Sequence, residues 1–594
     1  MSATPNLPDH PKALPQEARV PTRFSALQFA FKAFVLRWLR RLRDLSDASL
    51  QRHHQVDALV DAPILAESVT PLLRTLDDDF DLTLGKIHNL RVARKAFHNV
   101  VVPAQSTLSF WRQLGRPSGM RGFTAGRELR EGCVIPSTGG GLCQLSNALY
   151  DAALVAGLEI LERHRHSIAL PGSAAATDRD ATVFWNYVDL RFRSDSPFRI
   201  EVEMDAQTLR VRIRGERVAA NTGAENVPGA ARTTQSSHQC SSCGVIECFR
   251  NYPQLKGSTH TAWLLDDLWP EFLQHARTAA EPGDWIGSSR KIPGKFGADI
   301  ATHVARIYRW RAALHLRWQR LRGIPLAHTR TQNARHLAKS LARRLRPRDT
   351  HLIVAQSLLP YLHESGALAG RSYDVLMTSF PISTLQSQLD QARSKHPQST
   401  TLGDFRAPRW LVEAEDLALS RALSWISPHQ GALELAPARV LSLPWRKPTA
   451  APSSLRPNTG TSRVFFPASA LGRKGAYELR EAIQGMPLTL IVLHGADDAA
   501  DFWTGINVQS VNSIREGIDQ ADVVVLPAWI EHQPRALLEA LQAGLPVVAT
   551  MACGLGRDGG WSEVVPGDVS GLREAIRGHL FGCSRASAPA EIAQ

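Results

Sequence analysis

A run of three glycines, Gly139 to Gly141, leads through Leu142 into Cys143. Glycine allows the backbone to turn tightly and to approach another group closely. Apolar residues then recur at helical spacing from Leu145 to Ala156, so Cys143 is predicted to begin a half-buried helix. The start of a helix offers free N–H groups and a positive dipole end, which favour ionisation of a thiol. The pattern therefore predicts either a nucleophilic cysteine or a packed turn that contains an inert thiol.

Residues that could complete a catalytic site follow Cys143 in the chain. We expect His166, ahead of His164, to act as the base, and Asp180, ahead of Asp189, to orient the imidazole ring. A nucleophile, a base and an orienting carboxylate form the set that covalent acyl-transfer catalysis requires. The alternative is a buried thiol accompanied by core or surface histidines.

Five segments between about Thr107 and Gly215 together resemble the VanW domain. They are Thr107–Trp111, Gly122–Phe123, the run GGGLCQLSNALYDAALVAGLEILERHRHS that ends at Ser167, Asp180–Val183 and Asp189–Phe192. The family has no settled biochemical activity, so the resemblance implies a domain and not a reaction.

A short cluster of thiols follows a polar linker. His238, Cys240, Cys243 and Cys248 lie within eleven positions, and Gly244 comes directly after the C-x-x-C pair. Such a tight turn aims two sulfur atoms at one point, which suits tetrahedral zinc. An iron–sulfur cluster with an outside ligand, or free redox-active thiols, would also fit these residues. We favour zinc over iron because the motif is short and local.

Strand and helix patterns alternate cleanly from about residue 455 to 584, which predicts a parallel, doubly wound sheet. Ligands of such sheets bind beyond the carboxyl ends of the strands. Arg473 and Lys474 follow the first strand and could neutralise a diphosphate, while Glu531 and Glu539 flank the start of a helix. The alternative is a solvated basic pair and ordinary surface glutamates.

The run ADVVVLPAWIEHQPRALLEALQAGLPVVAT, Ala521 to Thr550, is similar to the donor-binding half of retaining nucleotide-sugar glycosyltransferases with the GT-B fold. The resemblance implies that Glu531 is a catalytic carboxylate at the donor sugar and that Glu539 holds the nucleotide ribose. It also implies that Lys474 stabilises the leaving diphosphate. The family's arginine is expected where Ala468 and Ser469 stand, so Arg473 is its substitute here.

The resemblance further implies an acceptor half that is also Rossmann-like. Its Gly-rich loop and its catalytic histidine are not recognisable in the sequence, so we expect a degenerate domain. Ser427-Pro428-His429 resembles the end of the strand before the family's domain crossing.

The fold class predicted is therefore α/β multidomain, with an α+β VanW-like domain ahead of a GT-B pair of Rossmann-like domains. The parts expected are a tail with an amphipathic and a polar helix (1–80), the VanW-like domain (81–218), a linker with the cysteine cluster (219–262), the acceptor half (263–450), the donor half (451–584) and a tail (585–594).

The amphipathic helix carries an apolar face formed by Phe24, Leu27, Phe31, Phe34, Trp38 and Leu42, with a basic end. It could lie on an anionic membrane or dock on the protein, and docking is favoured because such stripes are usually buried internally. No apolar run reaches the ~20 residues of a membrane span, and the first twenty residues do not resemble a secretory signal. The expected location is cytoplasmic, with contact at the inner face of the membrane.

The net charge of +13 is concentrated in one block. Between Ile300 and Arg348 there are twelve arginines and Lys339 but no acidic residue. Ile300, Val304, Ile307, Leu314, Trp318 and Leu321 keep helical spacing there. A solvated basic face is favoured over a phosphorylated or membrane-bound substrate, and nucleic acid is not favoured because no recognition motif is present.

The sequence thus predicts a bacterial protein that moves a sugar from a nucleotide-sugar donor to a cell-envelope or secondary-metabolite acceptor. One alternative is a non-catalytic scaffold that binds envelope precursors through a degenerate transferase. Another is a metal-sensing or nucleic-acid-binding protein. For the VanW-like part, thiol acyl chemistry and simple binding of the product both remain open.

Overall fold

The computed structural model describes most of the chain, with gaps. The described residues are 23–73, 80–130, 133–166, 178–216, 258–294, 296–297, 299–305, 310, 313–314, 317–318, 326–403, 406–446, 461–495, 497–499, 501–556 and 560–581. The chain divides into two compact units, Met1–Ser258 and Thr259–Gln594. Among the described residues, no helix combines the length and apolar character needed to cross a bilayer.

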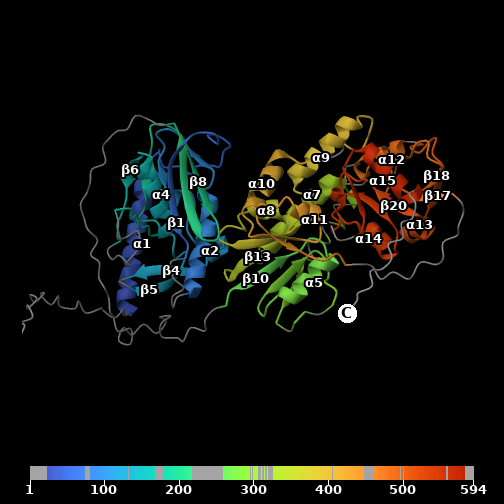
Figure 1. The fold of residues 1–594 in the computed structure, drawn as a ribbon. Helices are drawn as coiled ribbons and strands as arrows, with labels where there is room; N and C mark the ends of the chain where they lie inside the picture. Colours follow the sequence, from blue (N-terminus) through green and yellow to red (C-terminus); the bar gives the residue numbers. More distant parts are fainter. Residues whose placement is uncertain are drawn as a thin grey trace, which may run out of the picture. The chain divides into compact units, whose positions relative to one another are not determined.

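Unit 1 is built on a four-stranded antiparallel sheet with the order β1-β9-β8-β2 (Figure 1). Strands β8 and β9 pair as an antiparallel hairpin whose turn contains Asp205. Helices α2 and α4 pack on the sheet. These elements span Ile64–Pro71 (β1), Phe80–Phe97 (α2), Val100–Val102 (β2), Cys143–Val155 (α4), Phe198–Met204 (β8) and Thr208–Gly215 (β9).

Two smaller sheets complete unit 1, with the orders β3-β7-β6 and β4-β5. Their strands are Leu108–Ser109 (β3), Ala125–Arg130 (β4), Cys133–Thr138 (β5), Glu159–Glu162 (β6) and Arg191–Arg193 (β7).

Strand β1 lies in the segment that the sequence assigned to the N-terminal tail. No strand was predicted in that segment, but Ile64–Pro71 forms one, because buried Ala66 and Ser68 alternate with more exposed positions and the strand pairs with β9. Glu67 adds cross-strand ion pairs to Arg210 and Arg212 at 2.6 and 2.9 Å.

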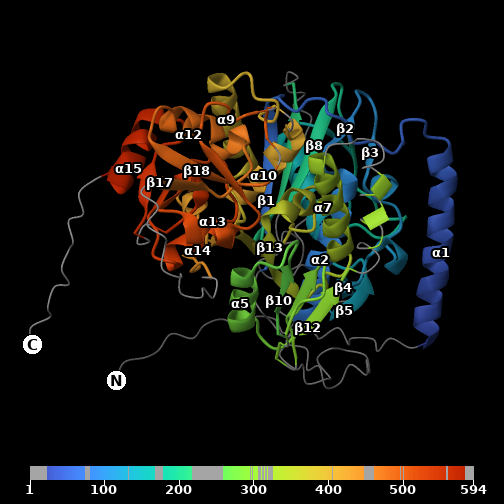
Figure 2. The same ribbon diagram turned by 90° about the vertical axis from the view of Figure 1, so that its right-hand side faces the viewer.

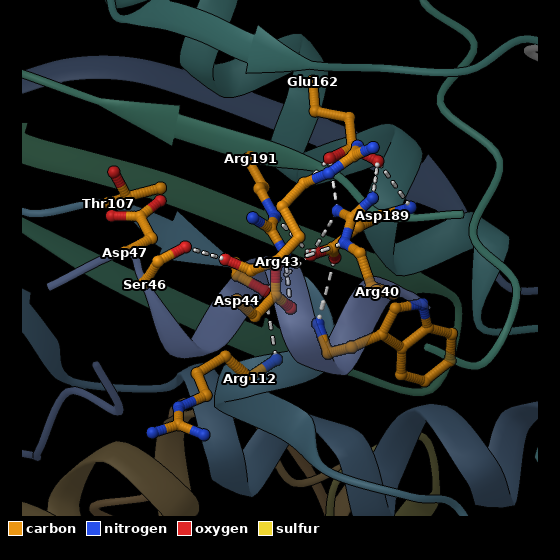
Figure 3. Close-up of polar contacts among 12 residues, drawn as sticks. Arg40, Arg43, Asp44, Ser46, Asp47, Thr107, Arg112, Glu162, Asp189 and Arg191 are labelled. Atoms are coloured by element: carbon orange, nitrogen blue, oxygen red, sulfur yellow. Dashed lines mark hydrogen bonds and ion pairs between the residues drawn. The ribbon is translucent and has the colours of Figure 1, made fainter. Parts of the chain in front are cut away.

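The amphipathic helix is α1, Arg23–Leu45, and it docks on unit 1. The expectation that its apolar stripe would be buried is wrong, because Phe34 and Trp38 are exposed. Polar side chains make the contacts instead, namely Arg37 and, as Figure 3 shows, Arg40 and Asp44. The side chains of Phe24 and Leu27 lie outside the described residues.

Unit 2 contains two open parallel sheets, so the predicted pair of Rossmann-like domains is confirmed (Figure 1). The acceptor sheet has the order β12-β11-β10-β13-β14-β15-β16, and the donor sheet β19-β18-β17-β20-β21-β22. Both follow the 3-2-1-4-5-6 winding whose reversal creates a ligand crevice, between β10 and β13 in one sheet and between β17 and β20 in the other. The acceptor half is therefore complete in strand order, although its loops lack the family's motifs.

The acceptor strands are His260–Leu264 (β10), Trp285–Ser288 (β11), Ala301–Val304 (β12), Asp349–Ala355 (β13), Ser372–Leu376 (β14), Ser424–Ser427 (β15) and Arg439–Ser442 (β16). Helices of this half include Pro270–Ala279 (α5), Leu326–Ala342 (α7), Leu359–Glu364 (α8), Ile382–Lys395 (α9), Arg409–Ser420 (α10) and Gln430–Leu433 (α11).

The donor strands are Ser462–Phe466 (β17), Leu488–Leu493 (β18), Val508–Val511 (β19), Val523–Leu526 (β20), Val547–Thr550 (β21) and Ser562–Val564 (β22). Its helices are Ala476–Ile483 (α12), Ile514–Gln520 (α13), Arg535–Gln542 (α14) and Val569–Phe581 (α15). The central strands β20 and β21 are buried along their whole length, as expected for a parallel sheet covered on both faces, whereas the edge strands β19 and β22 are mostly more accessible.

One element of the basic block differs from expectation. The helical spacing of Ile300 and Val304 is misleading, because Ala301–Val304 forms β12 and pairs in parallel with β11. Sheet pairing overrides the local periodicity here.

The glycine turn before α4 yields a prediction for stability. A Cβ atom at Gly140 would overlap the backbone of Gly126, so Gly140→Ala forces two backbone segments apart. We expect a loss of about 1–3 kcal/mol, typical of overpacking, seen as a lower Tm of the full chain. Gly119→Ala is the matched control, because nothing lies within 4 Å of the added atom. Equal Tm values for the two variants would show that the close approach does not constrain the fold.

Candidate functional sites

The first candidate site is the turn that leads into α4, which begins at Cys143 as predicted. Gly139 and Gly141 have φ values of 82° and 91°, which glycine adopts at little cost. The buried amide of Asn89 donates to the carbonyl oxygens of Thr124 and Gly140, both at 3.0 Å. Asn89 therefore clamps the turn, a positioning role that nothing in the sequence signalled.

The segment after Asp180 is hydrogen-bonded to helix α4. Asn147 accepts a hydrogen bond from the Ala181 amide at 2.7 Å, and the Ser146 hydroxyl donates to the Ala181 carbonyl at 2.5 Å. Asp180, only 1% exposed, contacts the backbone amide and the Nδ1 atom of His166, each at 2.6 Å. The structure thus brings together Cys143, His166 and Asp180, which lie apart in the sequence.

Electrostatic interactions within this site shift the pKa values of His166 and Cys143. Burial acts to lower the pKa of His166, but Asp180 and Cys143 raise it to about 10. Burial acts to raise the pKa of the Cys143 thiol, but its hydrogen bond with His166 and the charge of that ring hold it below the ordinary value. Both shifts favour the charged forms of the thiol and the imidazole ring, and the buried carboxylate of Asp180 orients that ring.

Further groups surround the sulfur atom. Cys143 Sγ lies 3.6 Å from the Thr182 hydroxyl and 3.7 Å from the Val183 carbonyl oxygen. Among the described residues, the amides of Leu142 and Cys143 have no hydrogen-bond acceptor. Two N–H groups beside a nucleophile can stabilise a negatively charged oxygen in an acyl-transfer intermediate.

The second-choice residues have other partners. His164 Nε2 lies 3.1 Å from a carboxylate oxygen of Glu162. Asp189 accepts hydrogen bonds from the hydroxyl of Ser109 at 2.6 Å and from Nε of Arg191 at 2.9 Å. The structure assigns Asp189 to the packing between β3 and β7, and it does not place either residue against Cys143.

The second candidate site lies at the switch point of the donor sheet, in the loops after β17 and β20. Gly475 has a φ of 75°, and a Cβ atom there would overlap the carbonyl of Pro527, so the two loops touch. Lys474 Nζ donates to a Glu531 carboxylate oxygen at 2.7 Å and to the Ile530 carbonyl at 3.2 Å. Burial acts to raise the pKa of Glu531, but Lys474 outweighs it and keeps that pKa below its ordinary value.

Arg473 and Glu539 are the other two residues that the sequence predicts at the donor site. The Arg473 side chain is exposed, and only its carbonyl is engaged, by the amides of Trp529 and Ile530 at 3.0 and 3.2 Å. Glu539 lies half-buried on α14, eight positions after Glu531. Within the part of the chain that the structure describes, neither side chain has a hydrogen bond or an ion pair.

His429, which the sequence placed at the domain crossing, reaches the donor half. Its Nε2 atom donates to the carbonyl oxygens of Glu531 and Ala552, at 3.0 and 3.2 Å, while Nδ1 accepts from the Ala432 amide at 3.1 Å. Burial lowers the pKa of His429, so the ring is neutral and carries its proton on Nε2. This buried histidine therefore fixes the backbone of Glu531.

A bidentate ion pair joins the two halves of unit 2 nearby. Arg535, at the start of α14, contacts both carboxylate oxygens of Glu271 on α5, at 2.7 and 2.8 Å. Glu271 also accepts from the Arg446 amide at 2.8 Å. Because α14 carries Glu539, this ion pair helps to set the position of that carboxylate.

The acceptor sheet carries polar groups at its own switch point, and the sequence did not single out Asp266 among them. Asp266 follows β10 and accepts a hydrogen bond from Ser357, which follows β13. Burial raises the pKa of Asp266. The available signal was an acidic residue placed directly after the apolar run of Trp263–Leu265.

The predicted metal ligands, His238, Cys240, Cys243 and Cys248, lie outside the described residues. Within the described ranges, no three His, Cys, Asp or Glu side chains gather as a metal site would require.

Comparison with protein families assigns both parts of the chain. The family model described as VanW like protein matches residues 85–214, and the one described as Glycosyl transferases group 1 matches residues 489–580.

Two curated relatives match the first of these parts. Uncharacterized protein YoaR of Bacillus subtilis (strain 168) is 32% identical over 136 residues, which are 23% of this chain and 44% of that protein. Vancomycin B-type resistance protein VanW of Enterococcus faecalis (strain ATCC 700802 / V583) is 29% identical over 130 residues, which are 21% of this chain and 47% of that protein. The chain thus spans less than half the length of either relative.

Among solved structures, sucrose-phosphate synthase from Thermosynechococcus elongatus aligns with 54% of this chain and 89% of its own, at 14% identity and a TM-score of 0.34. On the two family matches, the chain carries a VanW-like domain and, after it, a group 1 glycosyltransferase domain.

Proposed function

We propose that unit 2 transfers a sugar from a nucleotide-sugar donor to an acceptor hydroxyl with retention at the anomeric carbon. The observation that carries the proposal is the Lys474–Glu531 ion pair, 2.7 Å long, at the switch point of the donor sheet. Arg473 precedes Lys474 in the same loop and Glu539 lies on α14, and within the described residues neither side chain has a hydrogen bond or an ion pair.

Each side chain has a distinct role in this proposal. The bond between the anomeric carbon and the diphosphate oxygen breaks, and Lys474 and Arg473 stabilise the charge that develops on the leaving diphosphate. Glu531 binds the donor sugar, and Glu539 accepts hydrogen bonds from the ribose hydroxyls. The acceptor oxygen bonds to the anomeric carbon, and its proton leaves with the diphosphate.

The acceptor belongs at the opposite switch point, beside Asp266 and Ser357. A half-buried carboxyl and a hydroxyl suit recognition of hydroxyl groups on a polyol or sugar acceptor. A cell-envelope component or a secondary metabolite has this chemistry.

The geometry around Cys143 favours a second candidate function for unit 1, namely acyl transfer through a thioester. The sulfur attacks an acyl carbonyl carbon, the amides of Leu142 and Cys143 stabilise the oxyanion, and His166 passes a proton to the leaving group. A second nucleophile then releases the acyl group and restores the thiol. Simple binding of the transferase product by unit 1 is the alternative.

The transferase proposal predicts different effects for two substitutions. Lys474→Ala should reduce kcat more than donor affinity, whereas Glu539→Gln should weaken donor binding, since each removes a charge-assisted contact worth about 1.5–3 kcal/mol, or roughly ten- to a hundredfold. Release of nucleoside diphosphate from a panel of nucleotide sugars would give kcat and KM. Glu574→Gln, an exposed substitution on α15, is the matched control. Parent-like kinetics in both site variants would remove the assignment.

The thiolate proposal predicts the pH dependence of alkylation. Cys143 should react with iodoacetamide with a midpoint below the ordinary thiol pKa, while Cys553, whose pKa burial raises to about 12, stays unreactive. His166→Ala should move the Cys143 midpoint upward, because burial then acts without the imidazolium. His164→Ala should leave the midpoint unchanged. An unreactive Cys143, or one whose midpoint ignores His166→Ala, would identify a packing thiol.

A further inference from the structure

The polar side of α1 forms ion pairs with other residues of unit 1. Arg40 forms a bidentate ion pair with Glu162, one contact being 3.0 Å, and Asp44 contacts Arg191 at 2.8 and 2.9 Å (Figure 3). Asp189, almost fully buried, lies 2.9 Å from Arg191. A salt-bridge network of this kind, partly screened from water, holds the helix in one rotation about its axis.

The other side of α1 is an apolar stripe without cover in the part of the chain that the structure describes. Phe31, Phe34 and Trp38 are 69%, 64% and 56% exposed, and Val35, Leu42 and Leu45 are also exposed. At 3.6 residues per turn these six side chains fall within an arc of about 100°. The helix runs along the outside of unit 1 (Figure 2), and the exposed fractions show that the stripe is not packed against the described part of that unit. Exposed apolar patches of this kind mark interaction sites.

Cations border this stripe on both sides. At helical spacing, Lys32 and Arg43 fall along one edge and Arg41 along the other, and all three are exposed. None of them has an ion pair among the described residues. Asp44, the only acidic residue of α1, forms an ion pair with Arg191. The outward side therefore combines apolar groups with three uncompensated positive charges.

We propose that α1 binds flat on an anionic lipid surface, with the apolar stripe in the headgroup region and its polar side still attached to unit 1. Lys32, Arg41 and Arg43 complement the lipid phosphates at the edges of the stripe. A second copy of the chain fits less well, because pairing the same faces would bring like charges together. The proposal is independent of sugar transfer and concerns the surface on which the protein acts.

Vesicle co-sedimentation of the full chain tests the proposal. Binding to vesicles of phosphatidylcholine mixed with phosphatidylglycerol should be strong at low salt and should fall as salt rises. The double substitution Phe34→Ser with Trp38→Ser should lower the partition coefficient at least ~10-fold. Met120→Ser is the matched control, because Met120 is 99% exposed in unit 1 but lies outside α1. Unchanged Tm and kcat would show that the double variant folds.

The charges form a second arm of the test. Lys32→Gln with Arg41→Gln should weaken binding to the mixed vesicles and leave the residual binding to pure phosphatidylcholine unchanged. The proposal is overturned if the double apolar variant binds mixed vesicles as the parent does, or if pure phosphatidylcholine binds equally well. It is also overturned if sedimentation equilibrium shows a dimer that Phe34→Ser with Trp38→Ser abolishes, since a second copy then covers the stripe.

Discussion

Gly140 and Gly475 each lie where two stretches of backbone pass too close together for a Cβ atom. Gly140 faces the backbone of Gly126, and Gly475 faces the carbonyl of Pro527. In both places a side chain that can do chemistry is adjacent, Cys143 at the start of α4 and Lys474 before α12. The contact sets where each side chain stands relative to its partner, His166 in one site and Glu531 in the other. Geometry at both sites thus depends on the absence of two methyl groups.

The second feature that the two sites share is an anionic side chain paired with a neighbouring cation. Burial disfavours the ionised forms of Cys143 and Glu531, yet a neighbouring cation outweighs it in each case. The same balance holds Glu162 ionised beneath α1, where Arg40 lowers its pKa against the effect of burial. The cost of burying such pairs is repaid only with precise hydrogen bonding. That requirement accounts for the fixed supports around each pair, such as Asp180 behind His166 and His429 behind Glu531.

The features predicted correctly from the sequence are those that a local residue pattern determines. The buried run Val523–Leu526 and the helix from Cys143 were correct because periodicity and glycine signals act over a few residues. Contacts between residues far apart in the sequence could not be predicted, because no local pattern indicates them. Examples are the hydrogen bond of Asn89 with Gly140 and the ion pair of Glu271 with Arg535. The helix α1 shows the same limit, since its period was evident but its docked face was chosen by Glu162 and Arg191, more than a hundred residues away. Sheet pairing likewise turned Ala301–Val304 into a strand.

Unit 2 is proposed to bind a nucleotide sugar between the loops after β17 and β20. Hydrogen–deuterium exchange of the full chain, with and without a saturating nucleotide sugar, tests this binding most directly. We expect slower amide exchange in residues 472–475 and 531–539, with no change around Gly139–Asn147. Protection confined to the turn before α4, or no protection in the two donor loops with any nucleotide sugar, would contradict it.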